Sequence, residues 1–82
     1  MKHSIEAKIK QVASNIRKTR EQYHYTQEYL AVKLNISQNA YSKIELGYTK
    51  ITLERLFQIA EILEVDVFDL LNLTNKAGKI AS

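Results

Sequence analysis

Residues 34–47 of the 82-residue chain read LNISQNAYSKIELG and contain several uncharged side chains that can both donate and accept hydrogen bonds. In a helix over residues 38–46, with about 100° between successive residues, the polar side chains share one side. They are Gln38, Asn39, Ser42 and Lys43. Gln and Asn amides can bond two atoms of an adenine, Lys can donate to guanine, and Ser can serve several bases. The predicted helix could therefore form hydrogen bonds with base edges in the major groove of duplex DNA.

This polar face is free of carboxylates. No Asp or Glu occurs between Ser37 and Ile44, whereas exposed helices of small domains commonly carry both Glu and Lys. Negative side chains would be repelled by DNA phosphates, so their absence favours a surface that faces DNA. The segment is short, and an ordinary solvated helix face is the alternative interpretation.

The net charge of +3 is distributed unevenly along the chain. Residues 1–50 hold nine Lys or Arg and four Asp or Glu, whereas residues 51–82 hold three and five. The basic half contains the polar face, and a basic surface attracts polyanions and steers their association. Charge alone does not distinguish a polyanion-binding site from a solvated surface.

Apolar spacing and capping residues predict five helices with short connections. Their expected ranges are residues 5–22, 27–34, 38–46, 53–63 and 67–71. The expected N-caps, in the same order, are Ser4, Thr26, Ser37, Thr52 and Asp66. Gly47 follows the third helix, at the position where a left-handed conformation is favourable. The chain has no proline and two glycines, as is typical of an all-α domain.

The apolar faces of these helices predict how they pack. The stripe on the first helix consists of Ile5, Ile9, Val12, Ala13, Ile16 and Tyr23, and the apolar face of the fourth consists of Leu53, Leu56, Phe57, Ala60 and Leu63. Between the second and third helices, Asn35 tolerates a left-handed turn and Ile36 is expected to reach the core. Ala31 permits a close crossing, so the two helices form a helix–turn–helix at a steep angle.

Composition argues against several other classes of protein. The chain has no cysteine, and its two histidines are far apart in sequence, so we expect no metal site, no cofactor and no enzyme activity. No apolar run approaches the ~18 residues of a membrane span, and no signal peptide is visible. Amphipathic helices can also bind a membrane surface, but this role is less favoured here because the apolar faces of the five helices can pack against one another. We expect a single cytoplasmic domain.

Two segments, TQEYLAVKLNISQNAYSKIELG and TLERLFQIAEILEVDVFDLL, resemble the lambdoid repressor and Cro type of helix-turn-helix protein, the Xre-like family. The resemblance covers roughly residues 16–71 and depends most on Thr26-Gln27, Ala31, the Ile-Glu-x-Gly ending at 44–47 and the closing run 60–71. It implies an all-α, five-helix lambda-repressor-like DNA-binding domain with an extended first helix. The implied organisation is an N-terminal extension (1–11), the helix-turn-helix domain (12–71) and a short C-terminal tail (72–82).

The resemblance also implies roles for individual residues. Bases would be contacted by Ser37, Gln38, Asn39, Ser42 and Lys43. Phosphates would be contacted by Arg17, Thr26, Gln27, Thr49 and Lys50. Gln27 would also brace the recognition helix, and Arg20 would form a structural ion pair with Glu45 beneath it.

The chain departs from the family pattern at several positions. Asn35 occupies the turn where the family often has glycine, and Leu46 stands where a polar, phosphate-facing residue is common. Tyr41 replaces an aliphatic residue on the inner face, and its hydroxyl is expected to reach the edge of the core. The extension could pack on the core or pair with another subunit through Ile5 and Ile9.

We therefore expect a transcription regulator, most simply a repressor, that binds a pseudo-palindromic double-stranded DNA site as a homodimer. The candidate dimer residues are Phe68, Leu71 and Leu73, although Phe68 could equally belong to the core. The alternative is an antitoxin that also binds a toxin or another protein partner. About eleven residues follow the fifth helix, too few for a small-molecule-binding domain, so a stand-alone regulator is expected.

Overall fold

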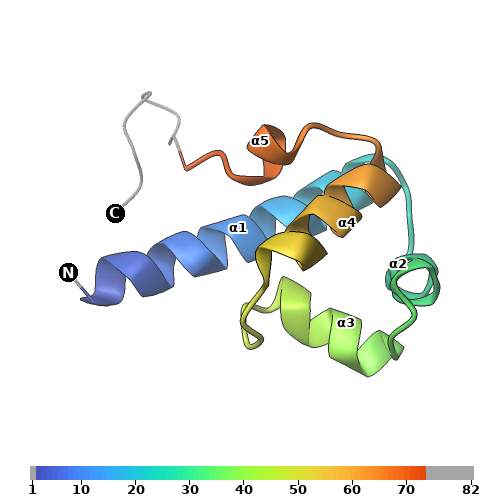
Figure 1. Ribbon diagram of the computed structural model, residues 1–82, viewed down its shortest axis with the longest axis horizontal. Helices are drawn as coiled ribbons and strands as arrows, with labels where there is room; N and C mark the ends of the chain where they lie inside the picture. Colours follow the sequence, from blue (N-terminus) through green and yellow to red (C-terminus); the bar gives the residue numbers. More distant parts are fainter. Residues whose placement is uncertain (1, 74–82) are drawn as a thin grey trace.

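Five helices make up the described part of the chain, which is residues 2–73 of the computed structural model, with side chains from residue 5 onward (Figure 1). They are α1 (Lys2–Gln22), α2 (Gln27–Leu34), α3 (Gln38–Glu45), α4 (Leu53–Leu63) and α5 (Val67–Leu70). No strand occurs in residues 2–73, and the predicted all-α fold is confirmed. Of the predicted C-terminal tail, residues 74–82 lie outside the described part.

Side-chain caps define where α2 to α5 begin. The hydroxyls of Thr26, Ser37 and Thr52 each accept a hydrogen bond, of 3.0, 3.0 and 3.1 Å respectively, from the backbone N–H three residues further on. Asp66 Oδ1 accepts one of 3.0 Å from the N–H of Phe68. These four predicted caps are confirmed, because each oxygen satisfies an N–H that has no partner inside the helix. The predicted cap at Ser4 is wrong, since α1 begins at Lys2 and contains it.

Each of the helices α1 to α4 is followed by a residue in a left-handed backbone conformation, which turns the chain sharply. Asn35 caps α2 with φ 59°, as its tolerance for this conformation predicts. After α3, Gly47 has φ 78°, and the N–H groups of Gly47 and Tyr48 bond the carbonyls of Ile44 and Lys43 at 3.1 and 3.0 Å. The third and fifth helices each end one residue earlier than predicted, at Glu45 and Leu70.

A single core collects buried side chains from all five helices. Its members are Ala13, Ile16, Leu30, Ala31, Leu34, Tyr41, Ile44, Leu56, Ile59, Ala60, Leu63 and Leu70. The predicted apolar face of α4 is wrong at two positions, because Leu53 and Phe57 are exposed by 67% and 53%. Ile59 takes their place, and the buried side of α4 is therefore centred on Ile59 and Ala60.

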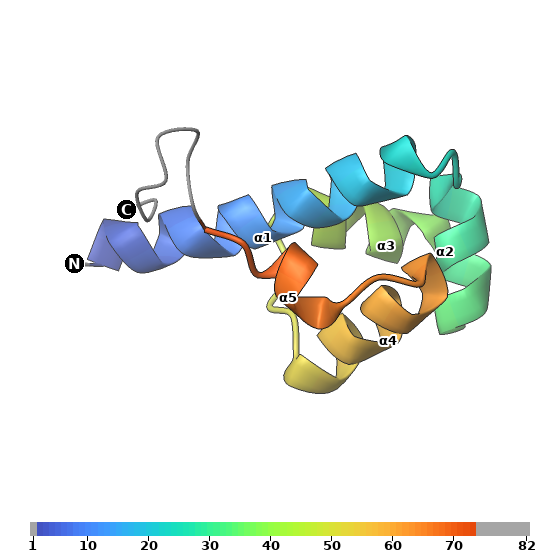
Figure 2. The same ribbon diagram turned by 90° about the horizontal axis from the view of Figure 1, so that it is seen from above.

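The N-terminal half of α1 extends beyond this core, as Figure 2 shows. Ala13 is buried, whereas Ile9 is 42% and Ile5 60% exposed. Of the two roles expected for the extension, packing of Ile5 into the core is therefore wrong. At the other end of α1, Tyr23 also leaves the predicted stripe and is 49% exposed.

Gly47→Ala should lower the free energy of unfolding by about 1–2 kcal/mol, the cost of placing a Cβ in a left-handed conformation. The added Cβ would also lie 3.2 Å from Lys10 Cγ on α1. Urea unfolding at neutral pH measures the change. The matched control is Glu64→Gly, which removes a Cβ at the left-handed cap of α4 (φ 57°) and should raise stability by up to about 1 kcal/mol. Equal stability of the wild-type and Gly47→Ala chains would contradict this account of the turn.

Candidate nucleic-acid interface

A tight turn joins α2 and α3. Figure 1 shows α2 almost end-on with α3 running across the view, so the two axes cross at a steep angle. The N–H of Ile36 bonds the carbonyl of Ala31 at 3.0 Å, which closes the turn onto the end of α2. Ile36 packs against the core, as predicted. The inner side of α3 is buried through Tyr41 and Ile44, which leaves its other side free for solvent.

The outer side of α3 carries the polar face expected from the sequence. Ser37, Gln38, Asn39 and Lys43 are exposed, and Ser42 is half-buried. Among the described residues, the side chains of Gln38, Asn39 and Lys43 form no hydrogen bond or ion pair with another protein group. Ser37 Oγ accepts from the N–H of Ala40, so its own proton can still be donated. The carboxylate of Glu45 faces inward, and this residue is only 5% exposed.

A groove of about 440 Å³ lies between α3 and the loop that precedes α4. Asn39 and Lys43 line it from α3, and Thr49 and Lys50 line it from the loop. Sequence reasoning missed one basic residue here: Arg55, in the first turn of α4, also lines the groove. Its Nη1 donates to Gln58 Oε1 at 3.2 Å and to the Leu34 carbonyl at 3.4 Å. The sequence offered one signal, a basic residue three positions after the predicted Thr52 cap.

The other predicted phosphate contacts lie outside this groove. Thr26 and Arg17 are exposed, on the cap of α2 and on α1 respectively. Gln27 is half-buried, and its Nε2 donates to Glu45 Oε1 at 3.1 Å. One amide proton of Gln27 is thus used to brace α3, and the second is left for a further acceptor.

A buried ion pair connects α1 with the end of α3. Arg20 Nε lies 2.7 Å from Glu45 Oε2, and Nη2 lies 3.1 Å from Oε1, so the guanidinium bonds both carboxylate oxygens. Arg20 Nη1 also donates to the carbonyl of Tyr25 at 2.9 Å. The side chains of Arg20 and Glu45 are only 11% and 1% exposed. Together with Gln27, this pair ties α1, α2 and α3 to one carboxylate.

Burial and pairing act in opposite directions on these charges. Burial alone would raise the pKa of Glu45. The hydrogen bonds from Arg20 and Gln27, the nearby Tyr41 hydroxyl and the Arg20 charge outweigh burial and lower that pKa. The hydrogen bond to Glu45 raises the pKa of Arg20 against the effect of its own burial. Both groups are therefore charged at neutral pH.

Tyr41 differs from its prediction. Its hydroxyl was expected at the edge of the core, but the residue is fully buried. Within the described part of the chain, this hydroxyl forms no hydrogen bond of ordinary geometry. Burial, and then the neighbouring Glu45 carboxylate, raise the pKa of Tyr41 well above its usual value. The hydroxyl therefore stays protonated next to the carboxylate.

The three candidate dimer residues lie in α5 and directly after it. Phe68 is 74% exposed, so its assignment to the core is wrong. Leu71 is 39% exposed and Leu73 is half-buried.

Comparison with known proteins gives one match. A family model described as helix-turn-helix matches residues 16–70, which is more than half of the chain and contains α2 to α5. No curated protein and no solved structure matches the chain. In residues 2–73, no helix combines the length and apolar character needed to cross a bilayer, and no cluster of three or more potential metal ligands occurs.

Glu45→Gln should lower the free energy of unfolding by about 3 kcal/mol or more at neutral pH, because Arg20 keeps its charge without a buried partner. The lowered pKa of Glu45 also gives a pH dependence. Its contribution to wild-type stability is present above the ordinary value of 4.5 and is lost as pH falls through the lower folded-state value.

Urea unfolding between about pH 2 and pH 7 measures both effects. The variant should lack the acid-dependent loss that comes from Glu45. The exposed Glu28 provides a control, since Glu28→Gln should change stability little. Parallel pH profiles for wild-type and Glu45→Gln chains would contradict the assignment.

Proposed function

The chain belongs to the Xre and lambda-repressor-like helix-turn-helix family of DNA-binding regulators, and on this premise we propose that it is a repressor that binds a pseudo-palindromic operator as a homodimer. The observation that carries the proposal is the exposed, carboxylate-free polar side of α3. It projects from a steep helix–turn–helix, and the inner side of α3 is buried through Tyr41 and Ile44. A helix of this shape can enter the major groove with its side chains aimed at base edges.

The proposed contacts fall into two groups. Ser37, Gln38, Asn39, Ser42 and Lys43 read bases, since their amides, hydroxyls and ammonium group supply the required donors and acceptors. Thr49, Lys50 and Arg55 contact phosphates on the loop side of α3. Arg17, Thr26 and Gln27 do so beside the start of α2. These contacts set the register of α3 on the duplex but carry no sequence information themselves.

Two copies supply the specificity that one lacks. A single α3 covers only a few base pairs, whereas a two-fold dimer places two recognition helices about 34 Å apart on one face of the DNA. Residues 12–71 form the DNA-binding unit in this proposal, and the dimer surface includes Phe68, Leu71 and Leu73. The protein would then act on DNA inside the cell.

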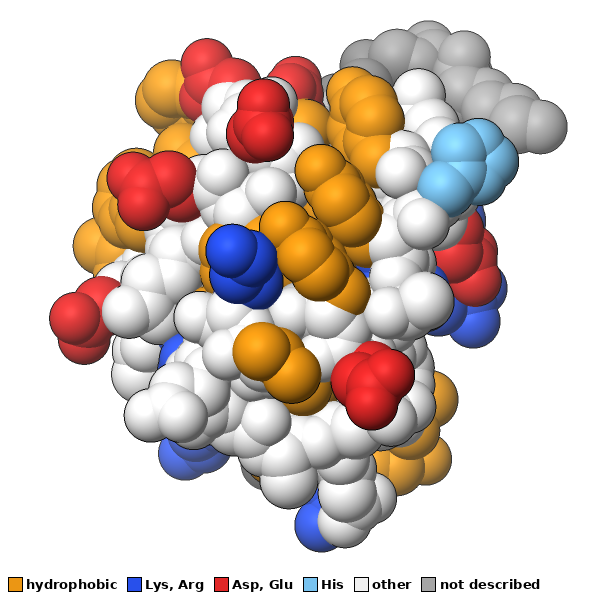
Figure 3. Space-filling model, turned by 90° about the vertical axis from the view of Figure 1, so that its right-hand side faces the viewer, with side chains coloured by type: hydrophobic (Ala, Val, Ile, Leu, Met, Phe, Trp, Pro, Cys, Tyr) orange, Lys and Arg blue, Asp and Glu red, His pale blue; other side chains and the backbone are white. Residues whose placement is uncertain are grey.

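An aromatic surface on the α2 side supports a second candidate role, in which the chain also binds a protein such as a toxin. The rings of Tyr25 and Tyr29 stack with centroids 4.9 Å apart, and Lys33 Nζ lies 5.6 Å from the centre of the Tyr29 ring. Tyr23 and Val32, which are close to these tyrosines in the sequence, are also exposed. Figure 3 shows hydrophobic side chains gathered on this side of the molecule with a basic side chain beside them. Such a surface is suited to a protein partner.

Gln38→Ala or Asn39→Ala should relax base preference at one operator position, at a cost of about 1–3 kcal/mol for the preferred base. Selection of bound sequences from a random DNA pool identifies the operator, and titration of single-base variants measures the change. Gln22→Ala, which removes an exposed amide at the end of α1, is the control. Equal loss of affinity for every sequence would contradict direct readout by these amides.

Lys50→Ala should weaken binding to all sequences and reduce the slope of log K against log salt by about one, because one phosphate contact is lost. Fluorescence anisotropy at several salt concentrations gives the slope. Lys33→Ala serves as the control, since Lys33 lies over Tyr29 and outside the groove. An unchanged slope would remove Lys50 from the phosphate contacts.

A further inference from the structure

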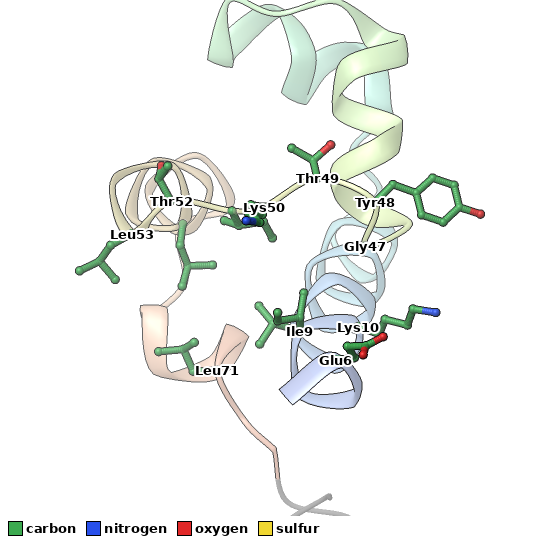
Figure 4. Close-up of a pocket in the computed structure, with 13 residues that line it drawn as sticks. Glu6, Ile9, Lys10, Gly47, Tyr48, Thr49, Lys50, Thr52, Leu53 and Leu71 are labelled. Carbon is green, nitrogen blue, oxygen red and sulfur yellow. The ribbon is translucent and has the colours of Figure 1, made fainter. Parts of the chain in front are cut away.

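A second groove, of about 510 Å³, opens on the side of the molecule where α1 extends beyond the core. Its lining comes from the N-terminal half of α1, the loop before α4, the start of α4 and the end of α5. Figure 4 shows Ile9, Leu53 and Leu71 around this groove, with Glu6 and Lys10 along the α1 side. The groove is thus mainly apolar, with one acidic group, Glu6, and two basic groups, Lys10 on α1 and Lys50 on the loop before α4.

The apolar surface continues past the groove along α1. Ile5, one turn before Ile9, is 60% exposed, and Leu53 on the opposite wall is 67% exposed. A small ligand could fill the hollow but would leave Ile5 in water. Covering the whole surface requires a partner about as long as two helical turns.

We propose that the occupant is a second copy of this chain, whose α1 extension lies antiparallel along the first. This inference rests on the homodimer of the proposed function and assigns its contact surface. In a two-fold dimer each surface must complement itself, because every contact occurs twice. Ile5 and Ile9 on one copy would interleave with the same two side chains on the other.

The two charges that α1 contributes to the groove satisfy this requirement. Glu6 and Lys10 are one turn apart on the same flank of α1, and neither takes part in an ion pair within the described structure. An antiparallel arrangement places Glu6 beside the partner's Lys10 and Lys10 beside the partner's Glu6. The same arrangement would place like charges together if both residues carried one sign.

The apolar groove also lies close to the groove beside α3, so a subunit contact here is compatible with a dimer that binds DNA through α3. The loop residues 49–52 line this groove and also line the groove next to α3. A second copy seated here would therefore adjoin the surface that faces DNA. Leu71, one of the candidate dimer residues, forms part of the same groove.

Sedimentation equilibrium of the full chain, alone and on a palindromic duplex, tests the proposal. Ile5→Glu should weaken self-association about tenfold or more, since it places a charge at the centre of the contact. Phe57→Glu is the matched control because Phe57 is an exposed apolar residue on α4, outside the groove. It should leave self-association unchanged.

Charge reversal tests the antiparallel arrangement. Glu6→Lys and Lys10→Glu should each weaken self-association, because like charges then face each other. An equimolar mixture of the two variants should associate more tightly than either alone, since every pair in the mixed dimer is again of opposite sign. A parallel pairing would also favour the mixture, but it would already place Glu6 beside Glu6 and Lys10 beside Lys10 in the wild type, so neither single variant would weaken self-association. Weakening by each variant together with recovery in the mixture therefore identifies the antiparallel arrangement.

Three outcomes would overturn the proposal. They are a wild-type chain that is monomeric both alone and on the palindrome, an Ile5→Glu chain that dimerises like wild type, and a mixture that shows no recovery. If the Ile5→Glu chain dimerises like wild type, the dimer contact is instead on the exposed face of α5. If the wild type is monomeric, the groove is free for a small ligand or another protein. Binding of each variant to a half-site duplex distinguishes failure of the proposed dimer contact from failure of the proposed DNA binding. Ile5→Glu should bind a half-site as wild type does, whereas loss of specific binding by the wild type would overturn the function itself.

Discussion

The position of the candidate recognition helix depends on one buried carboxylate. Glu45 stands at the last residue of α3, and its two oxygens receive the guanidinium of Arg20 from α1 and the amide of Gln27 from α2. A bidentate pair restricts both distance and orientation, which a single apolar contact does not do. Removing water from both charges is costly, so such a pair contributes less to net stability than to the choice of one arrangement. Here that arrangement is the angle at which α3 leaves the core.

This constraint also explains why α3 can show a carboxylate-free surface while containing a glutamate. The negative charge lies inside the protein, next to a positive one, and the Tyr41 hydroxyl remains protonated beside it. The outer side of α3 therefore presents amides, hydroxyls and Lys43 to its surroundings. The loop side adds Lys50 and Arg55, so the groove next to α3 is lined by three basic side chains and no acidic one.

Much of the fold could be predicted because its determinants are local. Caps at Thr26, Ser37, Thr52 and Asp66 act within three residues, and Asn35 and Gly47 adopt conformations set by their own backbone preferences. Features that depend on distant neighbours were not predictable. Periodicity gives α4 an apolar side but does not determine which part of a broad stripe meets α1 and α2, so Leu53 and Phe57 were misplaced. Tyr41 looked amphipathic, and only the packing around it shows that the hydroxyl is enclosed. The spatial proximity of Arg55 to Lys50 likewise required the start of α4 to be placed against α3.

The loop between α3 and α4 belongs to two surfaces at once. Residues 49–52 form one wall of the groove next to α3 and one wall of the apolar groove on the opposite side. A partner that holds this loop from either side removes part of its conformational freedom, and a second partner then loses less entropy on binding. The resulting free-energy coupling is reciprocal, so each partner tightens the binding of the other by the same factor. Residues 49–52 thus offer a direct route by which binding in one groove can strengthen binding in the other.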